Sequence, residues 1–492
     1  MRKNVRTGEE GEERAMKKGI WGLACLLALA AALMLPMGAL AQGTSAGWNA
    51  DGTVYTVVGK DGWWDKDDKQ IVLDHDCTVD LSQAETPDES IYNFYAPFKI
   101  AGTDTEVTFV TGEREEPLNL GNLALFYVAQ DCLNPTVVLD GVNLTSTEST
   151  YHQYSYNGEG TTVLTIRYKG ECFYPSLALS GKEEKVTFRF EPADKNSVLN
   201  IQNTYANWGI DAGAWERVTV ELIGGKIVTD GNVNVQGSNG YEETFDGALL
   251  IRDCDLTCTS IYARELTIDG ATVRTTSESE STGIRGGKTY NDKPDKGFLK
   301  IINDSNVNCA AVRDAATITI KDSTVNANAP ETYLNTAAIG GYFRELYIEN
   351  STISAHATGE KTSAIGAGRF ESYYYSGETD AYTITLKNSK VTATATKGNA
   401  IGSSYYESIG KNGQQCKQAT IIIDGGDVTA TAVNAPASAA IPSALRTAKP
   451  SPALHAILMT HMRILSAAAR PVKCGNSASD GFHRTIYSLY YS

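Results

Sequence analysis

Two arginines and one aspartate are the best candidates for catalysis in this chain. Arg285 follows Ile284, and Arg313 and Asp314 follow Val312, so the two arginines occupy equivalent positions of two similar segments. Two cations beside a carboxylate can stabilise developing negative charge and move a proton, which polysaccharide lyases and glycosidases require. The alternative is an ordinary solvated face, because charged residues commonly form one. The sequence therefore leaves the question of enzymatic activity open.

Aromatic residues in segments inserted between the repeats form a second set of candidates. Flat rings stack on the apolar C–H faces of sugars, while polar neighbours bind the hydroxyl groups. Repeated rings along one edge are therefore candidates for carbohydrate binding. Alternatively, the rings pack down on the protein and cover its edge. The tyrosines in question are Tyr290, Tyr342, Tyr373, Tyr374, Tyr375, Tyr405 and Tyr406.

A run of carboxylates near the N-terminus is a possible calcium site. Asp65, Asp67 and Asp68 alternate with lysines beside a pair of tryptophans. Carboxylate oxygens are the ligands that Ca²⁺ prefers, but the run lacks the spacing of a calcium-binding loop. A solvated turn is the favoured interpretation, and no cofactor is predicted.

Cys254 and Cys258 have a spacing that resembles half of a metal site. No partner pair of cysteines or histidines accompanies them, so a metal is not predicted. Cys258 and Cys309 instead stand where other repeats have Ala, Ser or Thr. We expect both to be buried thiols that act as small apolar groups, although an exported protein otherwise suggests disulfides.

The elements that must position these residues are repeated short strands. Nine copies contain two alternating apolar residues, a turn and a further apolar residue; Ile318-Thr-Ile320-Lys-Asp322-Ser-Thr-Val325 is a clear example. Alternation with β-branched residues predicts strands. Only Lys300, two residues before the aligned Ile302, breaks the apolar rule.

The turn between the two strands uses only Gly, Asp or Asn, which best tolerate a positive φ. We therefore expect a left-handed residue in every copy. The column contains Gly141, Gly224, Asp253, Gly270, Asp304, Asp322, Asn350, Asn388 and Gly425.

A third short strand follows in several copies, as in Ala364-Ile-Gly-Ala-Gly368. Three strands per repeat predict an all-β fold, a right-handed parallel β-helix (a solenoid) of about nine or more coils. The inserted segments leave after the third strand, so they should gather along one edge. A β-sandwich is the rival architecture, but it does not require this register.

The ends of the chain differ from the repeats. Residues 1–41 have the basic start, short apolar run and small-residue cleavage site of a secretory signal peptide. They predict a secreted protein that is either released or attached to the cell surface. Residues 42–130 are predicted as an N-terminal β region or cap, and 131–433 as the β-helix. Residues 434–492 form an atypical tail, predicted as either a helical cap or a frameshifted segment.

The charge of the chain limits its partners. The whole sequence carries −15, whereas residues 1–41 carry +2 and 434–492 carry +5, so residues 42–433 carry −22. This charge opposes binding to nucleic acid or anionic membranes. It also makes strongly acidic glycans poor ligands, and no transmembrane segment is expected in the mature chain.

The repeats resemble those of secreted bacterial right-handed parallel β-helix proteins, described as pectate-lyase-like or carbohydrate-binding surface proteins. The similarity lies in segments such as Ile423-Asp-Gly-Gly-Asp-Val428-Thr-Ala430 and in the Ala-Ile-Gly motif, over about residues 247–433. It implies a cell-surface setting but carries over no catalytic residues.

The favoured function is a non-enzymatic β-helix that binds carbohydrate, such as a host or cell-surface polysaccharide, or acts as an adhesin. A polysaccharide lyase or glycoside hydrolase on the same fold is the first alternative. A structural surface spacer is the second.

Overall fold

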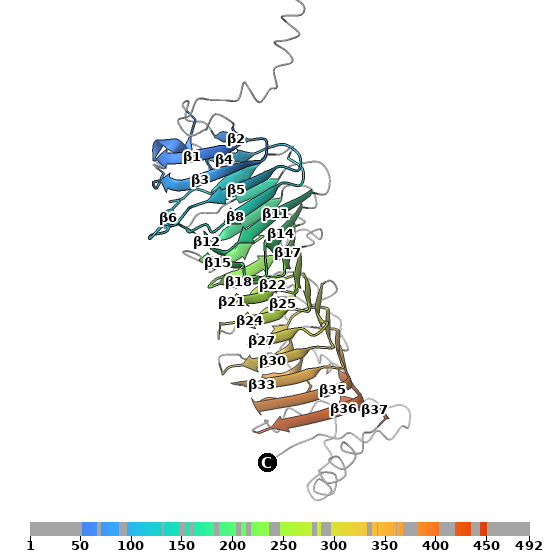
Figure 1. Ribbon diagram of the computed structural model, residues 1–492. Coiled ribbons are helices and arrows are strands. Elements are labelled where there is room, and N and C mark those ends of the chain that lie inside the picture. The colour runs from blue at the N-terminus through green and yellow to red at the C-terminus, as the bar shows by residue number, and fades with distance from the viewer. Residues whose placement is uncertain are drawn as a thin grey trace, which may run out of the picture.

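The protein is a parallel β-helix whose strands stack as rungs along a rod (Figure 1). The computed structural model describes residues 52–65, 70–87, 96–129, 132–146, 153–156, 162–181, 186–202, 208–212, 218–235, 247–277, 283–286, 297–331, 337–341, 343–360, 362–367, 382–402, 419–433 and 443–449. Every pairing between its strands is parallel, which confirms the predicted fold class. One short 3₁₀ helix, η2 (Asp61–Trp63), interrupts the strands near the start.

Each coil contributes a strand to up to three faces. The first face consists of β1 (Val54–Gly59), β3 (Cys77–Ala84), β5 (Glu106–Val110), β8 (Thr136–Asp140), β11 (Thr162–Lys169), β14 (Val186–Pro192), β17 (Val218–Ile223), β20 (Ala248–Arg252), β23 (Glu265–Asp269), β26 (Phe298–Ile302), β29 (Thr317–Lys321) and β32 (Glu345–Glu349). The second face consists of β6 (Leu118–Asn119), β9 (Leu144–Thr145), β12 (Glu171–Pro175), β15 (Val198–Gln202), β18 (Lys226–Thr229), β21 (Asp255–Cys258), β24 (Thr272–Thr275), β27 (Asn306–Cys309), β30 (Thr324–Ala329) and β33 (Thr352–Glu360). The long strands β35 (Tyr382–Lys397) and β36 (Ala419–Ala432) continue both of these faces.

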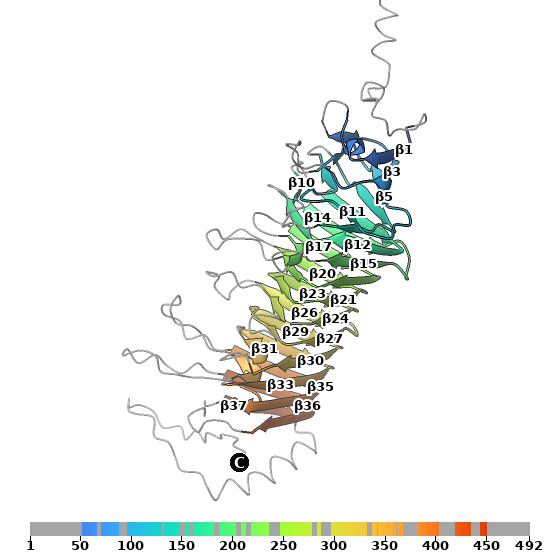
Figure 2. The ribbon, with the colours of Figure 1, turned by 90° about the vertical axis from the view of Figure 1, so that its left-hand side faces the viewer.

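The third face carries Arg285 and Arg313, which the sequence singles out. Two of its strands, β10 (Gln153–Tyr156) and β31 (Ala337–Gly341), are labelled in Figure 2. The face starts with β2 (Ile71–Leu73), β4 (Phe98–Ile100) and β7 (Phe126–Val128). It continues with β10 (Gln153–Tyr156), β13 (Leu177–Gly181), β16 (Trp208–Asp211), β19 (Asn232–Val235), β22 (Ile261–Ala263), β25 (Ile284–Gly286), β28 (Val312–Arg313), β31 (Ala337–Gly341) and β34 (Ser363–Ala367).

The core fills the inside of the coils, because side chains alternate inward and outward along every strand. Near the N-terminus it is aromatic, and the rings of Phe98, Phe109 and Phe126 contact one another along the axis. In later coils it is aliphatic, with Ile320 and Ile348 fully buried. Stacking coils buries this column continuously, so each coil depends on its neighbours for stability.

The predicted left-handed turns are present throughout the aligned column. All nine residues have a φ between 48° and 77°. The turn amides still bond to the next coil: the Asn350 amide donates to the Lys387 carbonyl at 3.0 Å. The turn therefore preserves the ladder while changing direction, which explains why only Gly, Asp and Asn occur there.

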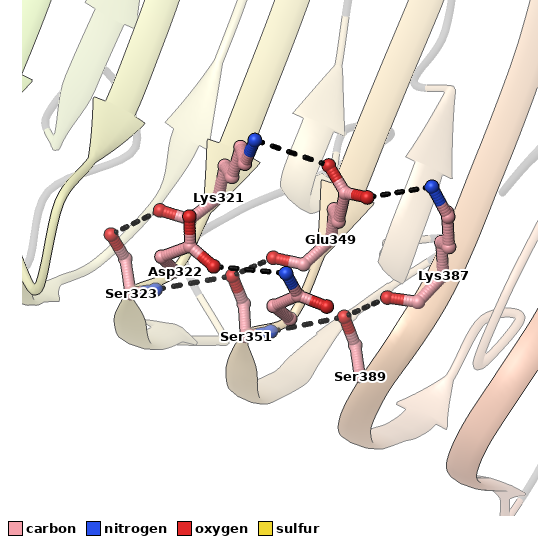
Figure 3. Close-up of polar contacts among 8 residues, drawn as sticks. Lys321, Asp322, Ser323, Glu349, Ser351, Lys387 and Ser389 are labelled. Atoms are coloured by element: carbon pink, nitrogen blue, oxygen red, sulfur yellow. Dashed lines mark hydrogen bonds and ion pairs between the residues drawn. The ribbon is translucent and has the colours of Figure 1, made fainter.

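A polar ladder joins successive turns at this corner (Figure 3). The amide of Ser323 donates to the hydroxyl of Ser351, and the amide of Ser351 donates to that of Ser389, at 3.2 and 3.1 Å. Outside this serine row, Glu349 pairs with Lys387 at 2.7 Å. The serine contacts satisfy backbone groups that the turn would otherwise bury unpaired.

The alignment of the sequence repeats is wrong by one residue in the copy that contains Ile302. Ile301, not Ile302, lies beside Ile268 and Ile320, and it is fully buried. Lys300 consequently points outward, so it is no exception to the apolar rule. The extra residue is absorbed in the turn, where Asn303 also has a positive φ of 56°.

The coils extend beyond the nine copies found in the sequence. Two further coils, β11 to β13 and β14 to β16, lie between Leu139 and Leu222. The first face also begins at β1, within the segment predicted as a β region or cap. In the tail, β37 (Ser443–Lys449) adds another parallel strand to β36, although the repeat pattern in the sequence stops after Val433. The helical cap is predicted around residues 452–469 of this tail, and these lie outside the described residues.

Candidate functional site: a polar and aromatic column on the third face

Five neighbouring strands of the third face align one outward-facing residue each. Strand pairing places Asn234 beside Asp211, Tyr262 beside Asn234, Arg285 beside Tyr262, and Arg313 beside Arg285. We call these five residues the third-face column. Four intervals of about 4.8 Å give it a length of about 19 Å along the rod.

A sixth residue, Trp208, joins the column because of a β-bulge. The register between β16 and β19 shifts between Trp208 and Ile210, so Gly209 is the extra residue. A bulge changes the side to which the preceding side chain points. Ile210 is fully buried, whereas Trp208 is partly exposed and its ring meets Tyr262 edge to face, with centroids 6.2 Å apart. The bulge thus adds a second aromatic ring to the column.

The ring of Tyr262 lies between an aromatic and a cationic neighbour. On one side it contacts Trp208, and on the other the guanidinium carbon of Arg285 lies 5.8 Å from its centroid. Such cation–π contacts hold both groups in place. Tyr262 remains partly exposed, so part of this residue is accessible from solvent. This arrangement is a preformed surface with apolar and polar parts side by side.

Arg285 and Asp314 form the best-defined ion pair of the column. Both Nε and Nη2 of Arg285 lie 3.0 Å from Oδ2 of Asp314, and Nε of Arg313 lies 3.6 Å from the same oxygen. The side chain of Arg285 is 21% exposed, against 9% for Arg313 and 10% for Asp314. Arg285 is therefore the cation that a ligand can reach, while Arg313 balances Asp314 from a more buried position.

The backbone around Asp314 is shaped to hold this carboxylate. Asp314 has a φ of 62°, and its amide donates to the Gly340 carbonyl at 3.0 Å. A Cβ on Gly341 would lie 2.6 Å from Oδ1 of Asp314, so a larger residue there would displace the carboxylate. Gly341, which has a φ of 66°, thus has a local steric role as well as a conformational one.

The opposite end of the column carries a second carboxylate. Nδ2 of Asn234 donates to Oδ1 of Asp211 at 2.8 Å. Burial raises the pKa of Asp211 above its ordinary value, and the bond from Asn234 partly opposes that shift. Oδ1 of Asn234 is buried and has no hydrogen-bond partner within the part of the chain that the structure describes. The column thus offers carboxylate and amide groups at one end and an arginine at the other.

The structure brings together Arg285, Arg313 and Asp314 as the sequence places them. The seven candidate tyrosines lie outside the described residues. Of the proposed calcium ligands, Asp65 is partly buried beside η2, while Asp67 and Asp68 also lie outside. Across the described ranges, no three His, Cys, Asp or Glu side chains are grouped as ligands for one metal ion.

Cys258 and Cys309 are buried free thiols, as expected from their columns. Cys258 lies beside Thr275, and Cys309 lies beside Ala327, both small residues. Burial raises the pKa of Cys309 to about 12 and that of Cys258 further still. Neither thiol is suited to nucleophilic chemistry.

Sequence reasoning missed Trp208, Asp211, Asn234 and Tyr262. The position of Tyr262 could have been predicted from the sequence, because it follows Ile261 just as Arg285 follows Ile284. Asp211 follows Ile210 in the same way, but its coil was not recognised. Trp208 gives no such signal, because a bulge is invisible in residue spacing.

Comparisons with protein-family models, with curated proteins and with solved structures found no match. Within the described ranges, the protein has no helix with the length and apolarity needed to span a membrane. The class of the protein is therefore defined by its own architecture, a parallel β-helix with a polar and aromatic column on its third face.

Proposed function

We propose that this protein is a secreted or cell-surface β-helix that binds carbohydrate through the third-face column without cleaving it. The observation that carries the proposal is the Tyr262 ring, held between Trp208 and Arg285 while partly exposed. Aromatic rings beside fixed hydrogen-bonding groups suit sugars, which combine apolar C–H faces with polar hydroxyl edges.

The dimensions of the column support a ligand that lies along the rod. Hydrogen-bonding and aromatic groups recur on consecutive strands, from Asp211 to Arg313. A linear polysaccharide also repeats its polar and apolar groups at regular intervals. Several weak contacts in a row would give useful affinity, because linked binding events reinforce one another.

The geometry favours binding over cleavage. Glycoside hydrolysis commonly uses two carboxyl groups that flank one bond. Asp314 is engaged by Arg285 and lies 3.6 Å from Arg313, whereas Asp211 is four strands away at the other end of the column. The cluster resembles a fixed polar surface more than a proton-transfer pair. The resemblance of the repeats to those of secreted bacterial β-helix proteins agrees with this proposal.

The test uses the purified chain on a panel of immobilised polysaccharides, with retention and new sugar ends scored in the same samples. We expect retention without new ends, and we expect Tyr262→Ala to weaken it about tenfold, or ~1.4 kcal/mol. Tyr347→Ala is the matched control, because Tyr347 is also partly buried and outward-facing, but lies on the first face.

Equal retention of both variants would reject the column as the binding site. New sugar ends that disappear in Asp314→Asn would instead establish an enzyme. Absence of both retention and cleavage across the panel would favour a structural spacer.

A further inference from the structure

We infer that the third-face column selects an uncharged glycan, and that Asp314 is the residue that enforces this selection. The inference rests on the proposed function and deepens it by naming the class of ligand. Its basis is the balance of charge in the column and the accessibility of each charged group.

The column and the adjoining Asp314 together contain two carboxylates and two guanidinium groups. Its charged side chains are Asp211, Arg285 and Arg313, and Asp314 lies against the two arginines. Their formal charges cancel, so the column as a whole offers no excess positive charge. Residues 42–433 carry −22, so the surroundings repel a polyanion.

Arg285, the more exposed of the two arginines in the column, already forms an ion pair within the protein. Arg285 directs both Nε and Nη2 at Asp314, each at 3.0 Å. A uronic acid or a sulfated sugar would need to compete with this internal carboxylate for the guanidinium. A hydroxyl group has no such conflict, because it can accept a bond from the remaining N–H groups of Arg285 and leave the ion pair intact.

The opposite end of the column also suits hydroxyls. The carboxylate oxygens of Asp211, which is only partly buried, accept hydrogen bonds that a sugar hydroxyl can donate. A carboxylate or sulfate on the ligand has no proton to donate and would meet these acceptors with repulsion. Both ends of the column therefore favour hydroxyl groups over carboxylate or sulfate groups on the ligand.

The experiment compares matched neutral and acidic polysaccharides. Immobilised β-glucan, galactan and mannan are each used native and after oxidation of the C6 hydroxyl to a carboxylate, at about 0.15 M salt. We expect the protein to be retained by at least one native form and to lose most of that retention on its oxidised form.

Substitution of Asp314 tests whether this residue sets the preference. Asp314→Asn keeps the size of the side chain and tolerates the positive φ, but frees the charge of Arg285. We expect it to raise retention on the oxidised form by up to about fivefold, the scale of an exposed ion pair. Asp140→Asn is the control, because it removes the carboxylate of an ion pair with Lys169 on the first face.

The outcomes separate this inference from the proposed function. Stronger retention on an oxidised form than on its native form, lost in Tyr262→Ala, would overturn the uncharged class but keep the binding site. Equal gains in Asp314→Asn and Asp140→Asn would remove Asp314 as the selecting residue. Retention on neither form would overturn both proposals. If Asp314→Asn fails to fold by circular dichroism, Arg285→Gln replaces it. Because this change leaves the charge of Asp314 less compensated, we expect retention to fall by a larger factor on the oxidised form than on the native form, and an equal fall on both forms would remove Asp314 as the selecting residue.

Discussion

The amide of Ser323 donates a 3.2 Å hydrogen bond to the hydroxyl of Ser351 on the next coil, and this hydroxyl donates to the Glu349 carbonyl at 2.6 Å. A single side chain thus satisfies two backbone groups at a buried corner. The side chains at this position are small because the corner is buried and has little space. They are polar because the backbone groups there need hydrogen-bond partners.

Ser351→Ala should lower the free energy of unfolding by about 1–3 kcal/mol, because it leaves the Ser323 amide buried without an acceptor. Urea unfolding followed by circular dichroism measures the change. Ser354→Ala is the control, since Ser354 is exposed on the neighbouring strand β33. Equal stability of the two variants would mean that water or another group replaces the lost hydroxyl.

Asn350→Ala should cost about 1–2 kcal/mol, because a residue with a Cβ and no local hydrogen bond is strained at a φ of 49°. Asn350→Gly should be milder, since glycine adopts this conformation freely and loses only the exposed bond to Asp322. Thermal unfolding of both variants separates the two effects. An equal loss in Ala and Gly variants would assign the cost to the side-chain bond instead of the backbone.

Stability should fall at acid pH partly through Glu349. The hydrogen bond from Lys387 lowers the pKa of Glu349 from its ordinary value of 4.5. A carboxylate with a lowered folded-state pKa stabilises the fold fully above 4.5, and this contribution is lost as the pH falls through the folded-state value. Glu349→Gln should therefore show a shallower loss of unfolding midpoint below pH 4.5.

Glu345→Gln, an exposed change on the same strand β32, provides the reference for that acid titration. It should retain the slope of the unsubstituted protein. Parallel slopes for Glu349→Gln and the unsubstituted protein would show that the ion pair with Lys387 does not contribute in solution.

Cys258 and Cys309 should resist alkylation in the folded protein. Burial raises the pKa of the Cys309 thiol to about 12 and also raises that of Cys258, so little of the reactive thiolate exists at pH 8. Treatment with iodoacetamide, followed by peptide mass spectrometry, should label both residues only after urea unfolding. Labelling of either one in the folded state would contradict its inward position.

The positions of Arg285 and Arg313 could be predicted because each follows a buried residue of a short third strand, Ile284 or Val312. The local pattern alone determined that these side chains point outward in register. It did not determine that Arg285 would pair with Asp314, because that contact depends on the positive φ of Asp314 and on the space left by Gly341.

Local sequence also determined the coil itself. Alternating apolar residues specify a strand, and Gly, Asp or Asn specifies a left-handed turn, because both depend on the conformation of a few adjacent residues. The tertiary structure decided how many coils form and which residues meet across them. The coil that contains Ile302 and the bulge at Gly209 each contain one extra residue. Strand pairing with the neighbouring coil decides where this extra residue lies. Trp208 joins Tyr262 for this reason, since pairing with the next strand, and not residue spacing, decides the side to which a side chain points.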